Sequence, residues 1–342
     1  MSDKKSIEVL ITLPMEESQL AAIRAVSKKL NVSLFPAKAV AEISPSQWEK
    51  IEILFTNSRI LPEPEAVPHL RWIQLNYAGV NKALDKPIIQ QGQVITTSTS
   101  GVIVSQVAEY AVTVCLALGR RLPALAGLQH EHSWPRNAWE TLVPRELRGS
   151  TVGIVGYGSI GREVARLLQP FGVRILAAKK DAMHPQDSGY IQEGLGDPEG
   201  TLFERLYPVE ALTDMLPECD FVVIALPLTD ETLHIIDATV LASMKSSAYL
   251  VNVGRGDIID EEALITALKE GRIAGAALDV FSQEPLPGDS PLWDMPNVIV
   301  TPHIAGLSPH LTEDTVNFFI KNLQRYLEEL PLYNQVDLEK GY

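Results

Sequence analysis

Cysteine is scarce in this sequence, and its scarcity excludes several classes of protein. Only Cys115 and Cys219 occur among 342 residues, and each stands beside apolar residues. Two isolated thiols provide neither a disulfide framework nor a metal cluster. We therefore expect two buried core cysteines, no metal site, and a protein of a reducing, cytoplasmic compartment.

Positive charge is scarce as well. The chain carries 29 lysines and arginines against 43 aspartates and glutamates, a net charge of -14, and no basic run offsets this excess. Such a surface repels phosphate backbones and anionic lipids. Nucleic acids and membranes are therefore not expected as partners, and a small-molecule partner is.

Long apolar runs and export signals are also missing. The most apolar helix candidate, Val102 to Leu118, is interrupted by Gln106 and Glu109, which makes insertion into a bilayer costly. The first thirty residues mix charges with a short strand-like run and lack the layout of a signal peptide. The expectation is a soluble protein without an export signal.

The sequence does contain two stretches in which short apolar runs alternate with helical patterns or turns. The first stretch has runs at Glu8 to Thr12, Ile51 to Phe55, Trp72 to Leu75 and Val94 to Thr97. The second has runs at Thr151 to Val155, Val173 to Ala178, Phe221 to Leu226, Tyr249 to Val253, Gly275 to Val280 and Val298 to Thr301. This alternation predicts an α/β protein with two doubly wound parallel sheets.

Four further segments complete this outline. We expect an apolar helix from Val102 to Leu122, a connector from His130 to Arg145 with Trp134 and Trp139, and a closing helix within Pro309 to Leu330. Ala182 to Tyr207, which is rich in glycine and acids, is predicted to be a long surface loop. It is either a tolerated insertion or a flap near a cofactor or subunit contact.

A glycine-rich motif directly follows the run Thr151 to Val155 and opens a helical pattern. Its residues are Gly156, Tyr157, Gly158, Ser159, Ile160 and Gly161. Gly156 permits a tight turn, Gly158 lets the backbone approach a pyrophosphate, and Gly161 lets helix pack on strand. The new helix offers free amides and partial positive charge to phosphates. The motif therefore predicts a dinucleotide site.

The next strand ends at Lys179 and Lys180, followed by Asp181. A carboxylate usually stands here to bind the ribose hydroxyls of NAD, whereas cations attract the 2'-phosphate of NADP. We therefore expect NADP to be favoured over NAD. The alternative is that Asp181 turns back to the ribose while the lysines are solvated.

Three candidate catalytic residues follow later strands: Arg255, Glu284 and His303. Each alone has an ordinary explanation, as a surface ion pair, a turn residue or a structural loop histidine. Together, at strand ends downstream of a dinucleotide motif, they suit reduction of a 2-keto acid. Arg255 could bind the carboxylate bidentately, and His303, oriented by Glu284, could supply the proton.

These features resemble the D-isomer-specific 2-hydroxyacid dehydrogenase family, to which glyoxylate/hydroxypyruvate reductases belong. The resemblance is strong from Gln106 to Gly306. Its carriers are Val107-Ala108-Glu109, the Gly156 to Gly161 loop, Leu226-Pro227-Leu228-Thr229 with Thr232, Asn252-Val253-Gly254-Arg255-Gly256, Leu278-Asp279-Val280-Phe281 with Glu284-Pro285-Leu286, and Thr301-Pro302-His303-Ile304-Ala305-Gly306.

The resemblance implies roles for further residues and a domain plan. Asp279 would hold the nicotinamide carboxamide, and Asn76, Tyr77, Ala78 and Gly79 would contact the substrate carboxylate or lie beside it. Val107, Leu226, Pro227, Thr232 and Val253 would line the cofactor site. A Rossmann nucleotide domain, residues 104–306, would be inserted into a smaller flavodoxin-like substrate domain, residues 1–103 and 307–342. Members resemble one another as homodimers joined through the nucleotide domains.

Two other functions remain open at this point. One is a nucleotide-sensing scaffold of the corepressor type, since the same fold serves that role. The other is a relative that oxidises formate or phosphite, although formate enzymes resemble this family with glutamine in place of Glu284. The sequence does not specify which 2-keto acid would be reduced.

Overall fold

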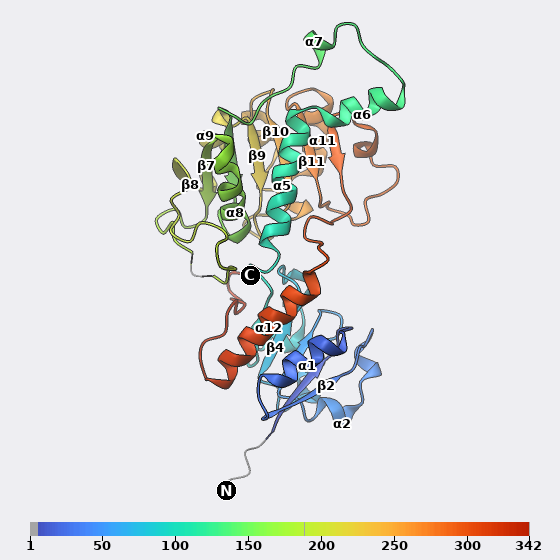
Figure 1. The fold of residues 1–342 in the computed structure, drawn as a ribbon, viewed down its shortest axis with the longest axis vertical. Helices are drawn as coiled ribbons and strands as arrows, with labels where there is room; N and C mark the ends of the chain where they lie inside the picture. The colour runs from blue at the N-terminus through green and yellow to red at the C-terminus, as the bar shows by residue number, and fades with distance from the viewer. Residues whose placement is uncertain (1–5, 188, 342) are drawn as a thin grey trace. The chain divides into compact units, whose positions relative to one another are not determined.

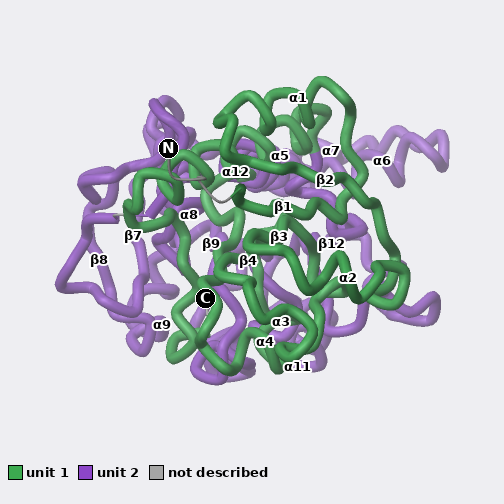
Figure 2. The backbone as a smooth tube through the Cα atoms, turned by 90° about the horizontal axis from the view of Figure 1, so that it is seen from below, with its two compact units in different colours: residues 1–103, 308–342 green, residues 104–307 purple. Residues whose placement is uncertain are grey.

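The computed structural model describes residues 6–187 and 189–341 and divides the chain into two compact units (Figures 1 and 2). Unit 1 comprises residues 1–103 and 308–342, and unit 2 comprises residues 104–307. Unit 2 is therefore inserted into unit 1. Each unit is built on its own parallel sheet with helices, which confirms the fold class predicted from the sequence.

Unit 1 contains a five-stranded sheet in the order β2-β1-β3-β4-β5, with every neighbouring pair parallel. The strands are β1 Ile7–Ile11, β2 Leu30–Leu34, β3 Ile53–Thr56, β4 Trp72–Leu75 and β5 Ile95–Thr97. This is the flavodoxin-like order 2-1-3-4-5. The sequence analysis missed β2, because an edge strand with alternating polar residues lacks the apolar run of a buried strand.

The helices of unit 1 are mostly short, and the C-terminal one completes its core. They are α1 Glu17–Ala25, α2 Pro45–Trp48, α3 Asn81–Leu84, α4 Pro87–Gln90 and α12 Leu311–Leu327. The long helix α12 lies beside α1 (Figure 1). Its Phe319 is fully buried and stacks on Phe55, with ring centroids 4.4 Å apart. The predicted closing helix thus supplies apolar surface to the start of the chain.

Unit 2 contains a seven-stranded parallel sheet in the order β12-β11-β10-β9-β6-β7-β8. Counted from β6 as the first strand, this is the dinucleotide-binding order 3-2-1-4-5-6 with one more strand beyond the sixth. The strands are β6 Thr151–Val155, β7 Arg174–Lys179, β8 Arg205–Pro208, β9 Phe221–Ile224, β10 Tyr249–Asn252, β11 Gly275–Leu278 and β12 Val298–Val300.

Seven helices of unit 2 accompany this sheet. They are α5 Val104–Gly119, α6 Leu122–His130, α7 Ala138–Thr141, α8 Ser159–Leu168, α9 Leu212–Met215, α10 Ala238–Ser243 and α11 Glu261–Lys269. Helix α5 packs on α8 and contacts β10 and β11. Helices α6 and α7 extend from the body of unit 2 (Figure 1).

The prediction of one helix from Val102 to Leu122 is wrong at its end. Helix α5 stops at Gly119, where a Cβ atom would lie 2.6 Å from the carbonyl oxygen of Arg145. Arg121 then adopts a left-handed conformation, φ 56°, and α6 begins with Pro123 in its first turn. Among the described helices none is long and apolar enough alone to cross a membrane; only α5 and α6 together, bent by 63°, pass that test.

The segment Ala182 to Tyr207 is not a surface loop throughout, so this prediction is also corrected. Its end contributes to β8, which pairs with β7 at the edge of the sheet. In its middle Asp197 is 5% exposed and accepts hydrogen bonds from the hydroxyl of Tyr157 at 2.7 Å and from two nearby amides. The glycine-rich composition of the segment does not indicate that these buried polar contacts form. Cys115 and Cys219 are buried and unpaired, as predicted.

Truncation of Phe319 should test how far the C-terminal helix stabilises unit 1. We expect Phe319→Ala to lower the free energy of unfolding of that unit by about 3–5 kcal/mol, because it leaves a cavity against Phe55 and Trp72. Chemical denaturation followed by tryptophan fluorescence measures this change, with the exposed Gln324→Ala as control. Equal stability of both variants would contradict the packing role.

Candidate active site

The predicted site residues of unit 2 lie where its parallel strands end. Gly156 follows β6, Leu226 follows β9, Asp279 follows β11 and His303 follows β12. The carboxyl ends of parallel strands meet at one edge of the sheet, where doubly wound folds bind their ligands. The structure therefore gathers the glycine-rich motif and the candidate catalytic residues at the same edge.

The glycine-rich turn has the geometry that a dinucleotide requires. Gly156 has φ 105°, and a Cβ atom there would lie 2.7 Å from the backbone of Ala225. A Cβ atom on Gly161 would lie 2.2 Å from the carbonyl oxygen of Gly156. At Gly158, by contrast, an added Cβ would meet nothing within 4 Å, so open space adjoins the start of α8. The close backbone packing at Gly156 and Gly161, together with the open space at Gly158, fits the binding of a pyrophosphate.

The side chain of Tyr157 does not line this open space. It is fully buried, packs edge-on against Phe203 with centroids 5.1 Å apart, and hydrogen-bonds Asp197. Burial, together with Asp197, raises the pKa of this phenol far above its usual range, so it remains a hydrogen-bond donor. Ser159 and Ile160 form the first turn of α8.

Three of the other predicted cofactor residues are buried apolar side chains. Val107, Leu226 and Val253 are each at most 8% exposed. The neighbouring turn is fixed by the hydroxyl of Thr232, which donates to the carbonyl oxygen of Pro227 at 2.7 Å.

Lys179 is held by the segment that follows it. Its ammonium donates to the carbonyl oxygens of His184 at 2.8 Å and of Gln186 at 3.0 Å. Burial lowers the pKa of Lys179, and the nearby charge of Arg162 lowers it further. A 2'-phosphate reaching this ammonium would compete with two backbone carbonyls.

Lys180 and Asp181 also have partners. The ammonium of Lys180 forms an ion pair with Glu231, and the carboxylate of Asp181 pairs with the ring of His184 at 2.7 Å. Both predicted alternatives, lysines that bind the 2'-phosphate of NADP and an Asp181 that turns to the ribose, would require these pairs to separate. Both pairs are between exposed side chains, and such surface pairs exchange readily.

Arg162 is a structural residue of this region that the sequence analysis missed. It lies on α8, is 1% exposed, and its guanidinium donates to the carbonyl oxygens of Asp197 and Pro185, with Asp187 3.4 Å from Nε. It therefore fastens the segment after β7 to the helix that follows the glycine-rich motif. No local sequence pattern distinguished this arginine from an ordinary exposed one.

His303 and Glu284 form the contact that the sequence predicted. Nδ1 of His303 lies 2.9 Å from Oε2 of Glu284, and the other oxygen of Glu284 accepts the amide of Phe281 at 3.2 Å. Both side chains are partly exposed, at 48% and 35%. The glutamate thus fixes the imidazole orientation while Nε2 remains available for a substrate.

Arg255 lies close enough to Glu284 to share its electrostatic field. Burial lowers the pKa of the Arg255 guanidinium, while the charge of Glu284 raises it. Its loop is fixed by Asn252, whose amide donates to the carbonyl oxygen of Arg255 at 2.9 Å. A Cβ atom on Gly256 would lie 1.9 Å from the carbonyl carbon of Phe281, so only glycine allows the two loops to pack this closely.

Asp279, which the resemblance assigns to the nicotinamide carboxamide, also has partners within the protein. Its Oδ1 accepts the amide of Ile304 at 2.9 Å and the hydroxyl of Thr301 at 2.6 Å, and its Oδ2 accepts the amide of Ala305 at 2.9 Å. The hydroxyl of Tyr110 lies 2.6 Å from that of Thr301. In this structure Asp279 therefore holds the loop that carries His303.

The four predicted residues of unit 1, Asn76, Tyr77, Ala78 and Gly79, form the turn after β4. The amide of Asn76 donates to Thr56 at 3.0 Å, and the carbonyl oxygen of Tyr77 accepts the amide of Thr99 at 3.1 Å. Oδ1 of Asn76 is buried and makes no hydrogen bond within the part of the chain that the structure describes. An unpartnered acceptor in this turn is compatible with a ligand there.

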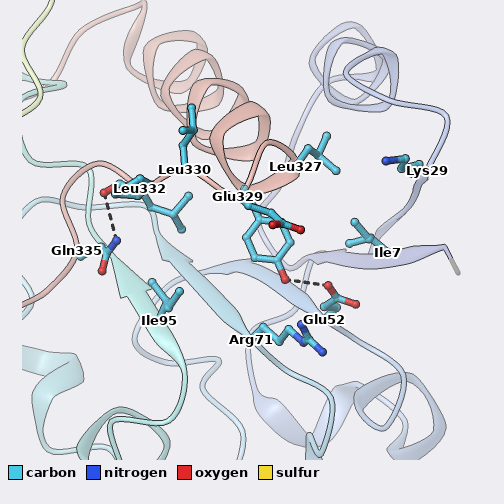
Figure 3. Close-up of a pocket in the computed structure, with 12 residues that line it drawn as sticks. Ile7, Lys29, Glu52, Arg71, Ile95, Leu327, Glu329, Leu330, Leu332 and Gln335 are labelled. Atoms are coloured by element: carbon cyan, nitrogen blue, oxygen red, sulfur yellow. Dashed lines mark hydrogen bonds between the residues drawn. The ribbon is translucent and has the colours of Figure 1, made fainter. Parts of the chain in front are cut away.

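A hollow of about 810 Å³ in unit 1 contains none of the predicted site residues (Figure 3). It is lined by the amino ends of strands, among them Ile7 and Ile95, and by the end of α12. Within it the hydroxyl of Tyr326 donates to a carboxylate oxygen of Glu52 at 2.8 Å. The turn after β4 lies at the opposite, carboxyl edge of the same sheet. Over the described residues, no group of His, Cys, Asp or Glu side chains is arranged to hold a metal.

Comparison with known proteins gives a consistent result. A family model described as D-isomer specific 2-hydroxyacid dehydrogenase, NAD binding domain, matches residues 112–305. A glyoxylate reductase of Thermofilum pendens is 37% identical over 273 residues, which are 78% of this chain and 75% of that protein. One of Thermococcus gammatolerans is 38% identical over 260 residues, 75% of this chain and 73% of that protein.

Solved structures resemble the whole chain. A D-isomer specific 2-hydroxyacid dehydrogenase of Xanthobacter autotrophicus, in complex with NADPH and MES, has a TM-score of 0.78 at 28% identity, covering 98% of this chain and 100% of that one. An NADPH-dependent glyoxylate/hydroxypyruvate reductase of Sinorhizobium meliloti, in complex with NADP and sulfate, has a TM-score of 0.74 at 26% identity, with the same coverage. The fold, the site and these likenesses agree, and the chain belongs to the D-isomer-specific 2-hydroxyacid dehydrogenase family of NAD(P)-dependent enzymes.

Proposed function

We propose that this enzyme reduces a small 2-keto acid to its D-2-hydroxy acid with NAD(P)H, using Arg255, Glu284 and His303. The observation that carries the proposal is the 2.9 Å contact between His303 and Glu284 at the sheet edge that also holds the glycine-rich turn. A bound nicotinamide would supply the hydride. The chain must then supply a proton and a counterion for the substrate carboxylate.

His303 is suited to supply the proton. With Nδ1 directed to Glu284, its Nε2 is the nitrogen that can face the carbonyl oxygen of a keto acid. A protonated imidazole there transfers one proton as the carbonyl becomes an alcohol, and the neutral ring accepts it in the reverse reaction. Glu284 stabilises the charged ring and fixes its orientation.

Arg255 is suited to bind the carboxylate. It extends from the β10 loop near Glu284, and it is partly buried, which strengthens its attraction for an anion. In unit 1 the turn of Asn76, Tyr77, Ala78 and Gly79, with the unpartnered Oδ1 of Asn76, is the proposed substrate contact. Unit 1 is accordingly proposed to bind the acid, and unit 2 the cofactor.

The substrate class is proposed from the named relatives. The proteins from Thermofilum and Thermococcus are called glyoxylate reductases, and the one from Sinorhizobium a glyoxylate/hydroxypyruvate reductase. We propose glyoxylate or hydroxypyruvate as the substrate. Turnover of longer 2-keto acids is the comparison for turnover of these two.

NADP is the proposed cofactor. No carboxylate occupies the position after β7 where NAD enzymes place one, and Lys179 and Lys180 stand there instead. The ammonium groups would exchange their present partners for a 2'-phosphate, whose greater charge compensates for the lost contacts. The structurally similar proteins of Xanthobacter and Sinorhizobium were solved with NADPH and NADP, respectively.

A homodimer is proposed from the segment after α5. Trp134 and Trp139 are 92% and 91% exposed, and Leu122, Leu125 and Val143 nearby are 40% to 56% exposed. So much exposed apolar surface on one extended arm marks an interface. A second copy of the chain is the proposed partner, joined through unit 2.

Replacement of the proton donor should lower turnover and leave cofactor binding intact. His303→Ala is expected to lower kcat for glyoxylate by about 10²-fold or more. Turnover is followed by NADPH absorbance, and NADPH binding by its fluorescence. His69→Ala, an exposed histidine of unit 1, is the control. Wild-type turnover by the His303 variant would refute the catalytic role.

Replacement of both lysines should change cofactor preference. Lys179→Ala with Lys180→Ala is expected to raise the KM for NADPH about tenfold or more and leave that for NADH nearly unchanged, because each lost cation weakens only the 2'-phosphate contact. Glu231→Gln, which removes the ion pair with Lys180, should lower the KM for NADPH. Lys269→Ala is a matched surface control. Equal changes with both cofactors would contradict the assignment.

Polar substitutions in the arm should dissociate the proposed dimer. Trp134→Ser with Trp139→Ser is expected to shift the sedimentation coefficient from that of a dimer to that of a monomer, because the two indoles supply the largest exposed apolar area of the arm. Analytical ultracentrifugation measures the change, with Trp293→Ser, half exposed elsewhere, as control. A monomeric wild type would exclude the dimer.

A further inference from the structure

Four hydrogen bonds connect helix α5 to the loop that carries His303. The hydroxyl of Tyr110, on α5, lies 2.6 Å from that of Thr301, which follows β12. The hydroxyl of Thr301 donates to Oδ1 of Asp279 at 2.6 Å. Asp279 in turn accepts the amides of Ile304 and Ala305, each at 2.9 Å.

The direction of these bonds follows from counting hydrogens. The hydroxyl of Thr301 has one hydrogen, and Asp279 takes it. The hydrogen between Tyr110 and Thr301 must then come from Tyr110. Burial raises the pKa of Tyr110 to about 12, an effect to which the charge of Asp279 also contributes, so the phenol keeps its hydrogen at neutral pH. Donation therefore runs from helix to threonine to carboxylate.

The carboxylate determines the shape of the loop. His303 has φ 56°, a left-handed conformation that residues other than glycine rarely adopt. This conformation allows the two amides after His303 to point at the two oxygens of one carboxylate. The strain of the loop is thus offset by hydrogen bonds to Asp279, and the loop places Nδ1 of His303 2.9 Å from Glu284.

We propose that Tyr110 and Thr301 are positioning residues that act through Asp279 to hold the His303 loop in the conformation that proton transfer requires. The inference rests on the proposed function, because it assigns His303 as the proton donor. Neither residue needs to touch substrate or cofactor. Tyr110 orients the hydroxyl of Thr301, Thr301 orients the carboxylate, and the carboxylate orients the loop.

The test compares Thr301→Val, Thr301→Ser and Tyr110→Phe with Thr113→Val, an exposed threonine on the same helix as Tyr110. Thr301→Val removes the hydrogen that Asp279 receives, and we expect kcat for glyoxylate to fall about tenfold or more, as small misplacements of catalytic groups do. The KM for NADPH should change less than twofold. Thr301→Ser keeps the hydroxyl and should restore at least half of the wild-type kcat.

Tyr110→Phe should lower kcat less than Thr301→Val does, because the hydroxyl of Thr301 can still donate to Asp279 but loses its fixed orientation. We expect a twofold to fivefold fall in kcat and a larger solvent deuterium isotope effect, since proton transfer becomes slower. A merely structural tether would lower the melting temperature and leave kcat, KM and the isotope effect unchanged. That result would overturn the proposal.

Hydrogen exchange supplies a readout that needs no activity. The amides of Ile304 and Ala305 should exchange more slowly than those of exposed loops in the wild type, and at least tenfold faster in Thr301→Val. Unchanged exchange in Thr301→Val would overturn the inference even if turnover fell. If the wild type reduces no 2-keto acid, the proposed function fails. Faster exchange in Thr301→Val would in that case still support the part of the inference that Thr301 and Asp279 hold the His303 loop.

Discussion

The site of this enzyme depends on the parallel pairing of the strands in unit 2. Parallel strands require crossover helices, and these bring every strand back to the same direction. The loops after β6, β9, β10, β11 and β12 therefore gather at one edge, although they are far apart in the sequence. Each loop then needs only one or two functional residues, and packing between neighbouring loops, such as that at Gly256, sets their spacing.

Much of this arrangement could be predicted from the sequence because the signals are local. The glycine-rich turn requires glycine at fixed positions, and the structure places a backbone or open space beside each one. The same holds for the contact of His303 with Glu284, since both follow strands whose apolar runs are evident. The strands of unit 2 that were predicted are all present, within one or two residues at their ends.

The remaining features depend on contacts that no local pattern reveals. The edge strands β2 and β8 are only partly buried, so their sequences lack a continuous apolar run. The end of α5 is set by the carbonyl of Arg145, twenty-six residues later along the chain. The partners of Lys179 come from the segment after it. Asp279 accepts three hydrogen bonds from the loop after β12, and these form only because the fold places that loop beside β11.

Helix α8 has two tasks on opposite sides, and this has a consequence for protein engineering. Its first turn adjoins the open space at Gly158, while Arg162 and Glu163 hold Pro185, Gly196 and Asp197 by hydrogen bonds. A relative with a shorter connection here has no need for a buried arginine on its helix. Transplanting the segment between members would therefore leave a guanidinium buried without acceptors, or carbonyls without donors, unless helix and segment are exchanged together.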